Sequence, residues 1–279
     1  MKLLPRLSGL RSLGLINCKQ LFMSGTFLSN QAEREMFQET LQGLESIQLD
    51  HNTYLSDVLL LRICSGLSSL KELSLESCNI MNHQSGIVTR LHPECDLPAS
   101  SSVLTWRIVV RIIQNISSLT SLSLANNTGI TIEDLCHCEN LKLETLNISG
   151  CSSVSTEGFL QLVQAQPAIV RLNVANSRKI LSCLKEQTED IFHALKSVRY
   201  LDISDNSIPH LRYLSSLPQL QDIIMNHIDS PGAEICEALT SSGSPPIQSF
   251  KSKNLSLSNS KLLMILSQRY DSIDMTCCL

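Results

Sequence analysis

The most regular alternation of apolar and polar residues lies in LETLNISGCSSV, from Leu143 to Val154. Leu146 and Ile148 stand two positions apart, so in an extended chain they point to one side and their polar neighbours point to the other. The stretch therefore predicts a short strand with one face in a core and the other in water. The side chains expected in water are those of Thr145, Asn147 and Ser149.

One such strand cannot bury its apolar face alone, and the pattern does recur along the chain. Its full spacing, L-x-x-L-x-L-x-x-C-x-L, is that of a leucine-rich repeat. Successive copies begin 34, 26, 49, 24, 26, 29, 22 and 27 residues apart, and six of these intervals fall within or at the 20 to 29 residues of that repeat. The nine copies begin at Leu10, Leu44, Leu70, Leu119, Leu143, Ile169, Val198, Leu220 and Ile247.

These repeats predict an α/β fold, a leucine-rich-repeat solenoid that curves into a horseshoe, with a parallel β-sheet on the concave face and helices on the convex face. We expect residues 1–279 to form a single domain of about nine repeats, because a solenoid stacks as one body. The last unit, residues 247–256, has lost its turn asparagine, and residues 247–279 are expected to form a degenerate last repeat and a cap, with residues 275–279 frayed.

Where the chain leaves each strand, the repeat carries a small polar residue or a cysteine. A stack of such side chains can pair the backbone groups that the turn leaves without partners. We therefore expect the cysteines in this column to be structural. The column consists of Cys18, Asn52, Cys78, Asn127, Cys151 and Asn206.

The segments between the strands predict the convex side. Leucine or isoleucine at every third position of residues 208–220 favours a 3₁₀-like or extended path. Residues 182–196 give the longest predicted helix. The other predicted helices are residues 31–42, 56–65, 106–116, 132–140, 156–165, 231–239 and 260–269. The inward stripe of the first of these consists of Met36, Phe37, Thr40 and Leu41.

The interval between the third and fourth repeats is 49 residues, about 23 more than a 26-residue repeat. Residues 83–105 contain prolines, a glycine and a run of small residues, and are expected to form an inserted loop. A loop of this length in a compact repeat array is usually functional or disordered. Its candidate binding residues are His83, Arg90 and His92.

Composition limits the classes of partner. The net charge is −4 and no concentrated basic run occurs, which argues against nucleic acid as a partner. No apolar run is long enough to span a membrane, and the first residues do not resemble a secretion signal. The odd count of 11 cysteines favours a reducing compartment, so we expect a cytoplasmic and possibly nuclear protein.

Two groups of residues have metal-ligand chemistry. Residues 136–138 read CHC, but on a helix side chains two apart diverge by about 200°, so the two thiols cannot easily share one tetrahedral ion. The inserted loop holds the other group, which needs the loop to fold around an ion. No catalytic or nucleotide-binding motif occurs. We therefore expect no cofactor, no metal site and no enzyme activity. The second group is His83, His92, Cys95 and Asp96.

The polar side of the strands is then the candidate site. Its charges are acidic in the early repeats, absent in the middle and basic at the end, which suits a groove for a protein segment. A solvated face without a partner is the alternative interpretation. The candidate partner-binding residues are Asp50, Glu72, Glu76, Thr145, Asn147, Ser149, Arg171, Tyr200, Asp202, Lys251 and Lys253.

Units such as LKELSLESCNI, LETLNISGCSSVSTEGFLQLV and VRYLDISDNSI resemble the cysteine-containing repeats of F-box/leucine-rich-repeat proteins, the substrate receptors of SCF-type (cullin-RING) ubiquitin ligases. The resemblance implies that the repeats hold a substrate. In that family a separate F-box binds the ligase adaptor, and no F-box helices precede Leu10, so adaptor binding would need a region absent here. The rhythm of residues 208–220 also resembles zyg-11-like receptors of elongin-type ligases. The alternative function is a non-ligase scaffold or regulator that binds one protein through the concave face.

Overall fold

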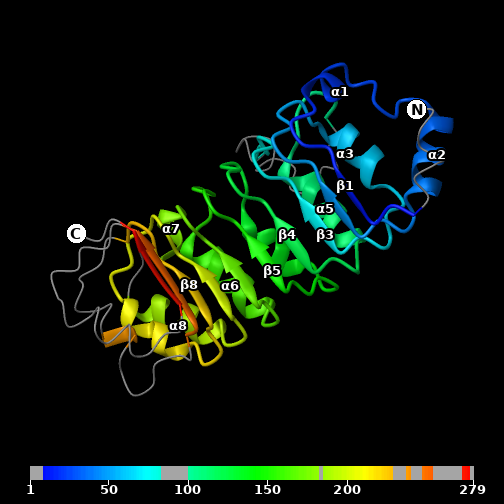
Figure 1. The fold of residues 1–279 in the computed structure, drawn as a ribbon. Helices are drawn as coiled ribbons and strands as arrows, with labels where there is room; N and C mark the ends of the chain where they lie inside the picture. The colour runs from blue at the N-terminus through cyan, green and yellow to red at the C-terminus, as the bar shows by residue number, and fades with distance from the viewer. Residues whose placement is uncertain are drawn as a thin grey trace. The chain divides into compact units, whose positions relative to one another are not determined.

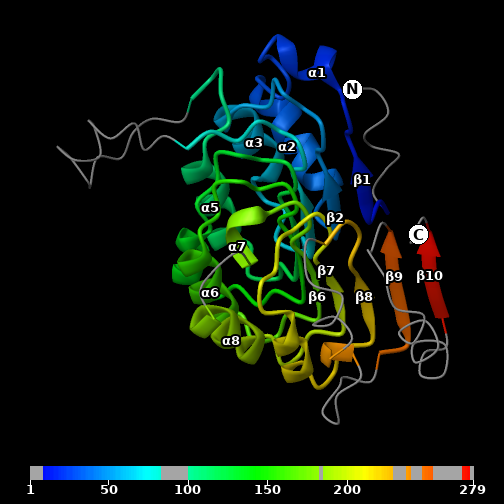
Figure 2. The same cartoon turned by 90° about the vertical axis from the view of Figure 1, so that its left-hand side faces the viewer.

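The computed structural model describes residues 9–82, 100–181, 185–228, 237–239, 247–253 and 272–276. The chain divides into two compact units, Met1–Lys142 and Leu143–Leu279. Each unit is a stack of parallel strands with helices on one side (Figures 1 and 2). The expectation that residues 1–279 form a single domain stays a prediction.

The first unit contains four strands that pair in chain order. They are β1 (Ser12–Gly14), β2 (Ser46–Gln48), β3 (Glu72–Ser74) and β4 (Ser121–Ser123). Their central residues Leu13, Ile47, Leu73 and Leu122 lie in register across the sheet. The three from β2 to β4 are at most 1% exposed, so the apolar position of the repeat faces the core as predicted.

The second unit contains six parallel strands, again in chain order. They are β5 (Thr145–Asn147), β6 (Arg171–Asn173), β7 (Tyr200–Asp202), β8 (Asp222–Ile224), β9 (Ser249–Lys253) and β10 (Ser272–Thr276). The first nine strands of the chain coincide with the nine predicted repeats. The tenth does not: residues 275 and 276, expected to fray, belong to β10, which pairs with β9 (Figure 2).

The convex side of the first unit follows from capping and periodicity. Asn30 accepts a hydrogen bond from the Ala32 amide at the start of α2, and Ser56 accepts one from Leu59 at the start of α3. The elements are α1 (Lys19–Met23), α2 (Gln31–Thr40), α3 (Asp57–Cys64), α5 (Trp106–Asn115) and the 3₁₀ helix η2 (Ile132–His137).

The second unit uses the same signals on its convex side. Ser155 caps α6 by accepting a hydrogen bond from the Gly158 amide. The predicted 3₁₀ rhythm of residues 208–220 is confirmed as η3. The elements are α6 (Thr156–Ala165), α7 (Arg178–Leu181), α8 (Lys185–Ala194) and η3 (Leu211–Ser216).

Several predicted boundaries need correction. Phe37 and Leu41 are buried as expected, but Met36 is 39% exposed, so the inward stripe of α2 is narrower than predicted. The predicted helix 132–140 is a 3₁₀ helix that ends at His137. The predicted helix 182–196 is α8, which begins at Lys185, while residues 182–184 lie outside the described residues. The predicted helix 260–269 and most of 231–239 also lie outside them.

The asparagine column forms the expected ladder. Asn127 is fully buried; its Nδ2 donates to the carbonyls of Leu75 at 2.8 Å and Leu124 at 2.9 Å, and its Oδ1 accepts from the Cys78 amide at 3.1 Å. Asn206 repeats this arrangement in the second unit by donating to Val174. Each asparagine therefore joins two adjacent repeats.

A second column of equivalent residues has left-handed backbone conformation. In each of the first eight repeats, the residue directly before the ladder position has φ between 50° and 70°. Only one of them is a glycine, at position 150; of the other seven, six are Asn, Asp or His, the side chains that adopt this conformation more readily than most, and Ser77 is the exception. The residues are Asn17, His51, Ser77, Asn126, Gly150, Asn176, Asp205 and His227.

Candidate protein-binding face

Side chains that point away from the helices form what we call the open strand face. In the first unit, two rows across the strands are fixed by register, Ser12–Ser46–Glu72–Ser121 and Gly14–Gln48–Ser74–Ser123. A third row follows the strands, because the amides of Asn17, His51 and Ser77 continue the pairing to the next repeat. The third row consists of Ile16, Asp50, Glu76 and Ala125.

The carboxylates of this unit are held in place by neighbouring strands. Asp50 Oδ1 accepts hydrogen bonds from Ser74 Oγ at 2.6 Å and from the Glu76 amide at 2.9 Å. Glu76 Oε1 accepts from Ser123 Oγ at 2.6 Å. The Glu72 side chain is exposed at the start of β3. The predicted acidic residues are therefore brought together, two of them in fixed orientations.

Directly before the first three strands of the same unit lies a cluster of exposed, oppositely charged side chains. Lys71 Nζ lies 2.8 Å from Glu45 Oε2, and Arg11 Nη1 lies 3.5 Å from Glu45 Oε1. The hydrogen bond and charge of Lys71, followed by the charge of Arg11, lower the pKa of the Glu45 carboxyl. Because all three side chains are exposed, solvent screens their charges and the ion pairs contribute little to the stability of the fold.

The second unit presents an aromatic–cation pair. The guanidinium carbon of Arg171 on β6 lies 4.4 Å from the ring centroid of Tyr200 on β7, its partner in the sheet register. Burial, followed by the charge of Asp202, raises the pKa of the Tyr200 phenol, while Arg171 opposes the shift. Asp222 on β8 adds to it. The phenol therefore keeps its proton near neutral pH and can donate a hydrogen bond.

In the next row of the second unit, each amide or carboxylate oxygen accepts a hydrogen bond from the residue two positions later in the chain. Asn147 Oδ1 accepts from the amide and the hydroxyl of Ser149 at 3.1 Å and 2.9 Å. Asn173 Oδ1 accepts from the Ala175 amide, and Asp202 Oδ1 accepts from the Ser204 amide, each at 3.0 Å. The row is therefore preorganised in the same way as the acidic rows of the first unit.

The remaining predicted residues are Thr145, two lysines on β9 and three residues of the inserted loop. Thr145 is half-buried beside Arg171 in the register of β5 and β6. Lys251 and Lys253 are exposed on β9, and Lys251 is in register with Ile224 on β8. His83, Arg90 and His92 of the inserted loop lie outside the described residues. Their role stays a prediction.

Sequence reasoning missed the anchor of the inserted segment. Asp57, which lies in the predicted helix 56–65, is buried and accepts hydrogen bonds from the Ser100 amide at 2.9 Å and the Thr105 amide at 2.6 Å. Thr105 Oγ1 also donates to it, at 3.0 Å. Trp106 Nε1 then donates to Asp134 at 2.8 Å. Asp57 and Thr105 are 48 residues apart, so no local sequence pattern links them.

Four of the six cysteines in the described ranges are buried, namely Cys64, Cys78, Cys138 and Cys151, while Cys18 and Cys136 are partly exposed. Burial raises the pKa of both the Cys64 and the Cys78 thiols to about 12, and Cys78 Sγ donates to the Leu49 carbonyl at 3.0 Å. Burial also raises the pKa values of Cys136 and Cys138. Within the described ranges, no three His, Cys, Asp or Glu side chains are grouped to hold a metal ion. The expectations of no metal, no cofactor and no enzyme activity stay predictions.

None of the helices in the described parts of the chain is both long and apolar enough to cross a bilayer.

Comparison with known proteins places the fold. No protein-family model matches the sequence, and no curated protein matches it. Among solved structures, the leucine-rich repeat-containing protein LegL7 from Legionella pneumophila has a TM-score of 0.60 at 16% identity, over 98% of this chain and 86% of that one. A chain of the mouse RP105/MD-1 complex has a TM-score of 0.51 at 19% identity, over 98% of this chain and 44% of that one.

Identities this low show the fold alone. The chain is an α/β leucine-rich-repeat solenoid, which confirms the predicted fold class. The finer resemblance to F-box/leucine-rich-repeat receptors stays a prediction.

Proposed function

We propose that this chain is a protein-interaction module whose partner lies on the open strand face. Repeat solenoids use extended faces of this kind for binding. The inward face of each strand is occupied by the core, so the polar face is the side of the sheet that a partner can reach. Hydrogen bonds from Ser74 and Ser123 fix Asp50 and Glu76 beforehand, and a preorganised face loses less entropy on binding.

The observation that carries the proposal is the Arg171–Tyr200 pair. Tyrosine and arginine are enriched among the residues that dominate binding energy at interfaces. Here a tyrosine with a retained phenol proton and an arginine 4.4 Å from its ring lie on adjacent strands of the open face. The pair offers a rigid apolar surface, a hydrogen-bond donor and a charge at one place, with Asp202 and Asp222 beside it.

The first unit adds a preference in charge. The charged residues in its three rows are Asp50, Glu72 and Glu76, all of them acidic. A partner segment with basic residues is therefore complementary to this unit. Lys251 and Lys253 give the opposite charge on β9.

The test is quantitative affinity capture. It compares a variant altered on the open strand face of the second unit with a matched variant altered on its helix side. We expect Arg171→Ala/Tyr200→Ala to lower recovery of the bound protein by about tenfold or more, since interface hot spots contribute about 2 kcal/mol or more each. The matched control is Arg212→Ala/Tyr213→Ala, because these residues form a similar pair, 5.2 Å apart, at the 3₁₀ helix η3.

A further variant guards against loss of folding. Glu72→Lys changes an exposed residue and should also weaken capture of a basic partner without shifting the urea midpoint. Equal recovery by the wild type, the strand-face pair and Glu72→Lys, with loss only in the η3 variant, would place the partner on the other side and reject the proposal.

The finer candidate is substrate recognition within a cullin-RING ligase. The ladder positions of Cys18, Cys78 and Cys151, which carry the resemblance to F-box/leucine-rich-repeat receptors, support it. The same capture, made with the longest natural form of the protein, separates the candidates. A ligase receptor should recover a cullin adaptor whose binding survives Arg171→Ala/Tyr200→Ala. A non-ligase scaffold should recover its partner without ligase subunits. Both candidates act in the cytoplasm or nucleus, and buried thiols such as Cys64 are compatible with that location.

A further inference from the structure

The first repeat lies at one edge of the sheet, where β1 pairs only with β2 among the described strands. Its core positions Leu13 and Leu15 are only half-buried, whereas the equivalent Ile47 and Leu49 of the second repeat are 0% exposed. A terminal repeat usually has a polar outer side, which keeps a solenoid soluble. Among the described residues, this side of the first repeat is apolar instead.

The backbone of β1 also directs hydrogen-bonding groups to this edge. In β2, the Gln48 carbonyl accepts from the Leu15 amide and the Asp50 carbonyl accepts from the Asn17 amide, so alternate residues of β2 pair with β1. Gly14 is the register partner of Gln48, so the corresponding groups of β1 point away from β2. They belong to Ser12, Gly14 and Ile16, and no described strand pairs with them. Such an edge is a template for a further strand.

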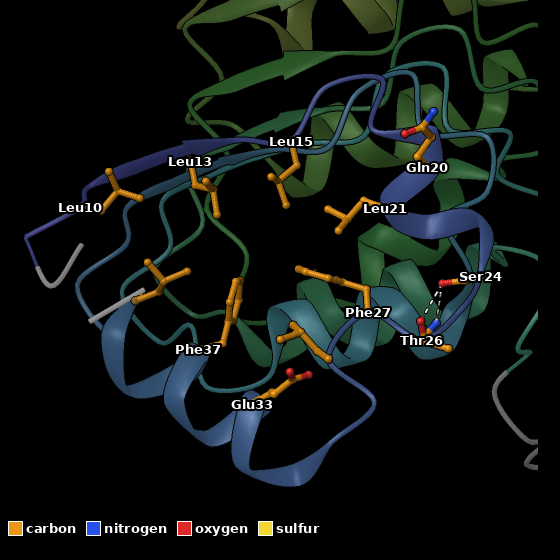
Figure 3. Close-up of a pocket in the computed structure, with 12 residues that line it drawn as sticks. Leu10, Leu13, Leu15, Gln20, Leu21, Ser24, Thr26, Phe27, Glu33 and Phe37 are labelled. Carbon is orange, nitrogen blue, oxygen red and sulfur yellow. Dashed lines mark hydrogen bonds between the residues drawn. The ribbon is translucent and has the colours of Figure 1, made fainter. Parts of the chain in front are cut away.

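The half-buried leucines line a cavity of about 540 Å³ (Figure 3). In the close-up, the leucines of the first repeat point down from β1 and the Phe27 and Phe37 rings lie below them. The two rings are packed edge to face, with centroids 6.2 Å apart. Leu41 at the end of α2 completes the apolar floor. The space suits aliphatic side chains that enter between β1 and α2.

The residues directly before the strands indicate which charge suits this edge. The Glu45 amide donates to the Arg11 carbonyl and the Lys71 amide donates to the Glu45 carbonyl, so the three residues form one row across the sheet. Their charges alternate, and the Glu45 carboxylate lies between two cations, 3.5 Å from Arg11 and 2.8 Å from Lys71. Arg11 ends the row with a side chain that is 69% exposed. A strand that continued the sheet would therefore complement it with an acidic residue beside Arg11.

We propose that the edge of β1 binds an extended segment of a partner protein, which adds to the sheet as a further parallel strand. The segment carries an acidic residue in the row of Arg11 and aliphatic residues in the rows of Leu13 and Leu15. Its aliphatic side chains enter the cavity, and its backbone pairs with the outward groups of Ser12, Gly14 and Ile16. The site is separate from the open strand face, because it uses the edge of the sheet.

The test titrates the complete chain with the synthetic peptide TETITLT and measures amide hydrogen exchange by NMR. In the proposed register, the glutamate of the peptide lies beside Arg11, and its isoleucine and leucine lie beside Leu13 and Leu15. We expect saturating peptide to slow exchange at the Gly14 and Ile16 amides by about tenfold or more, with unchanged exchange in residues 185–228.

Two control peptides leave the folded chain untouched. TETATAT lacks the aliphatic side chains that would fill the cavity, and TLTITET has the same composition in the reverse order. Neither should protect the Gly14 and Ile16 amides as TETITLT does.

An exchange of charge tests the contact with Arg11. Arg11→Glu should weaken binding of TETITLT by about two- to fivefold, as expected for an exposed ion pair. The peptide TKTITLT should then bind this variant more tightly than TETITLT does. Arg11 is exposed, so the substitution should shift the urea midpoint little.

Two results would overturn the proposal. The first is that TETITLT gives the Gly14 and Ile16 amides no protection, or no more than the control peptides give. The second is protection of the same amides by rising concentration of the chain alone, with a dimer in light scattering, which would assign the edge to a second copy. Failure of the open strand face would instead appear in the capture with Arg171→Ala/Tyr200→Ala, so the two proposals are tested independently.

Discussion

At the scale of single residues, the buried asparagines contribute more than their size suggests. Asn127 serves the carbonyls of Leu75 and Leu124 and the amide of Cys78, and no water can reach these groups once the repeats are stacked. Removal of the side chain would leave buried backbone groups unpaired, and each such group costs about 1 to 3 kcal/mol.

We predict that Asn127→Ala lowers the free energy of unfolding by about 2 to 5 kcal/mol, measured by urea titration with circular dichroism. Asn140→Ala is the control, because Asn140 is exposed and a surface substitution changes stability by about 0.5 kcal/mol or less. A similar midpoint for the two variants would show that the ladder is not a source of stability.

The sequence predicted this column but not the left-handed column beside it. Cys18, Asn52 and their equivalents recur at a fixed distance from the strand leucines, so spacing alone identifies them. The preceding residues are mostly Asn, Asp or His, which adopt left-handed conformations more readily than other side chains, so residue type was a signal that the leucine spacing did not use; Ser77 carries no such signal. The contact between repeats, such as the hydrogen bond from the His51 amide to the Glu76 carbonyl at 2.7 Å, is not visible in any local pattern.

At the scale of elements, the strands and helices followed the sequence where the signal was local. The predicted helices 56–65 and 156–165 and the triplet rhythm of residues 208–220 are confirmed as α3, α6 and η3, and the caps at Ser56 and Ser155 explain where the two α-helices begin. β10 was missed because its identity depends on pairing with β9 more than on its own residues. The segment that ends the insertion was missed for a related reason: Asp57, distant in sequence, holds it.

Close packing between successive turns provides a prediction at this scale. A Cβ on Gly129, in the turn after β4, would collide with the backbone of Ile80 and Asn82 in the preceding repeat. We predict that Gly129→Ala lowers the free energy of unfolding by about 1 to 3 kcal/mol in a urea titration, because backbone atoms cannot move aside as a side chain can.

Gly14→Ala is the matched control for this prediction. Its Cβ would meet only side-chain atoms at 3.8 Å or more, which is ordinary contact. If both alanine variants unfolded at the same urea concentration, the close approach of the two turns would be contradicted.

At the scale of the whole molecule, one rule organises both units: alternate residues of each strand divide between a core and an open face. The apolar half of this rule was predictable from leucine spacing. The polar half was predictable as a set of residues, but not as the Arg171–Tyr200 pair or the fixed Asp50 and Glu76 carboxylates, because these depend on contacts between repeats. The proposed partner site assumes this division.

The most direct measurement is a urea titration of Leu146→Ala beside Thr145→Ala, two adjacent residues of β5 on opposite faces. Leu146 is 1% exposed, so its truncation should cost about 2 to 5 kcal/mol, and neighbouring repeats should lose stability with it. Thr145 lies on the open face and its truncation should cost about 0.5 kcal/mol or less. Similar midpoints for the two variants, or the larger loss in Thr145→Ala, would contradict the account.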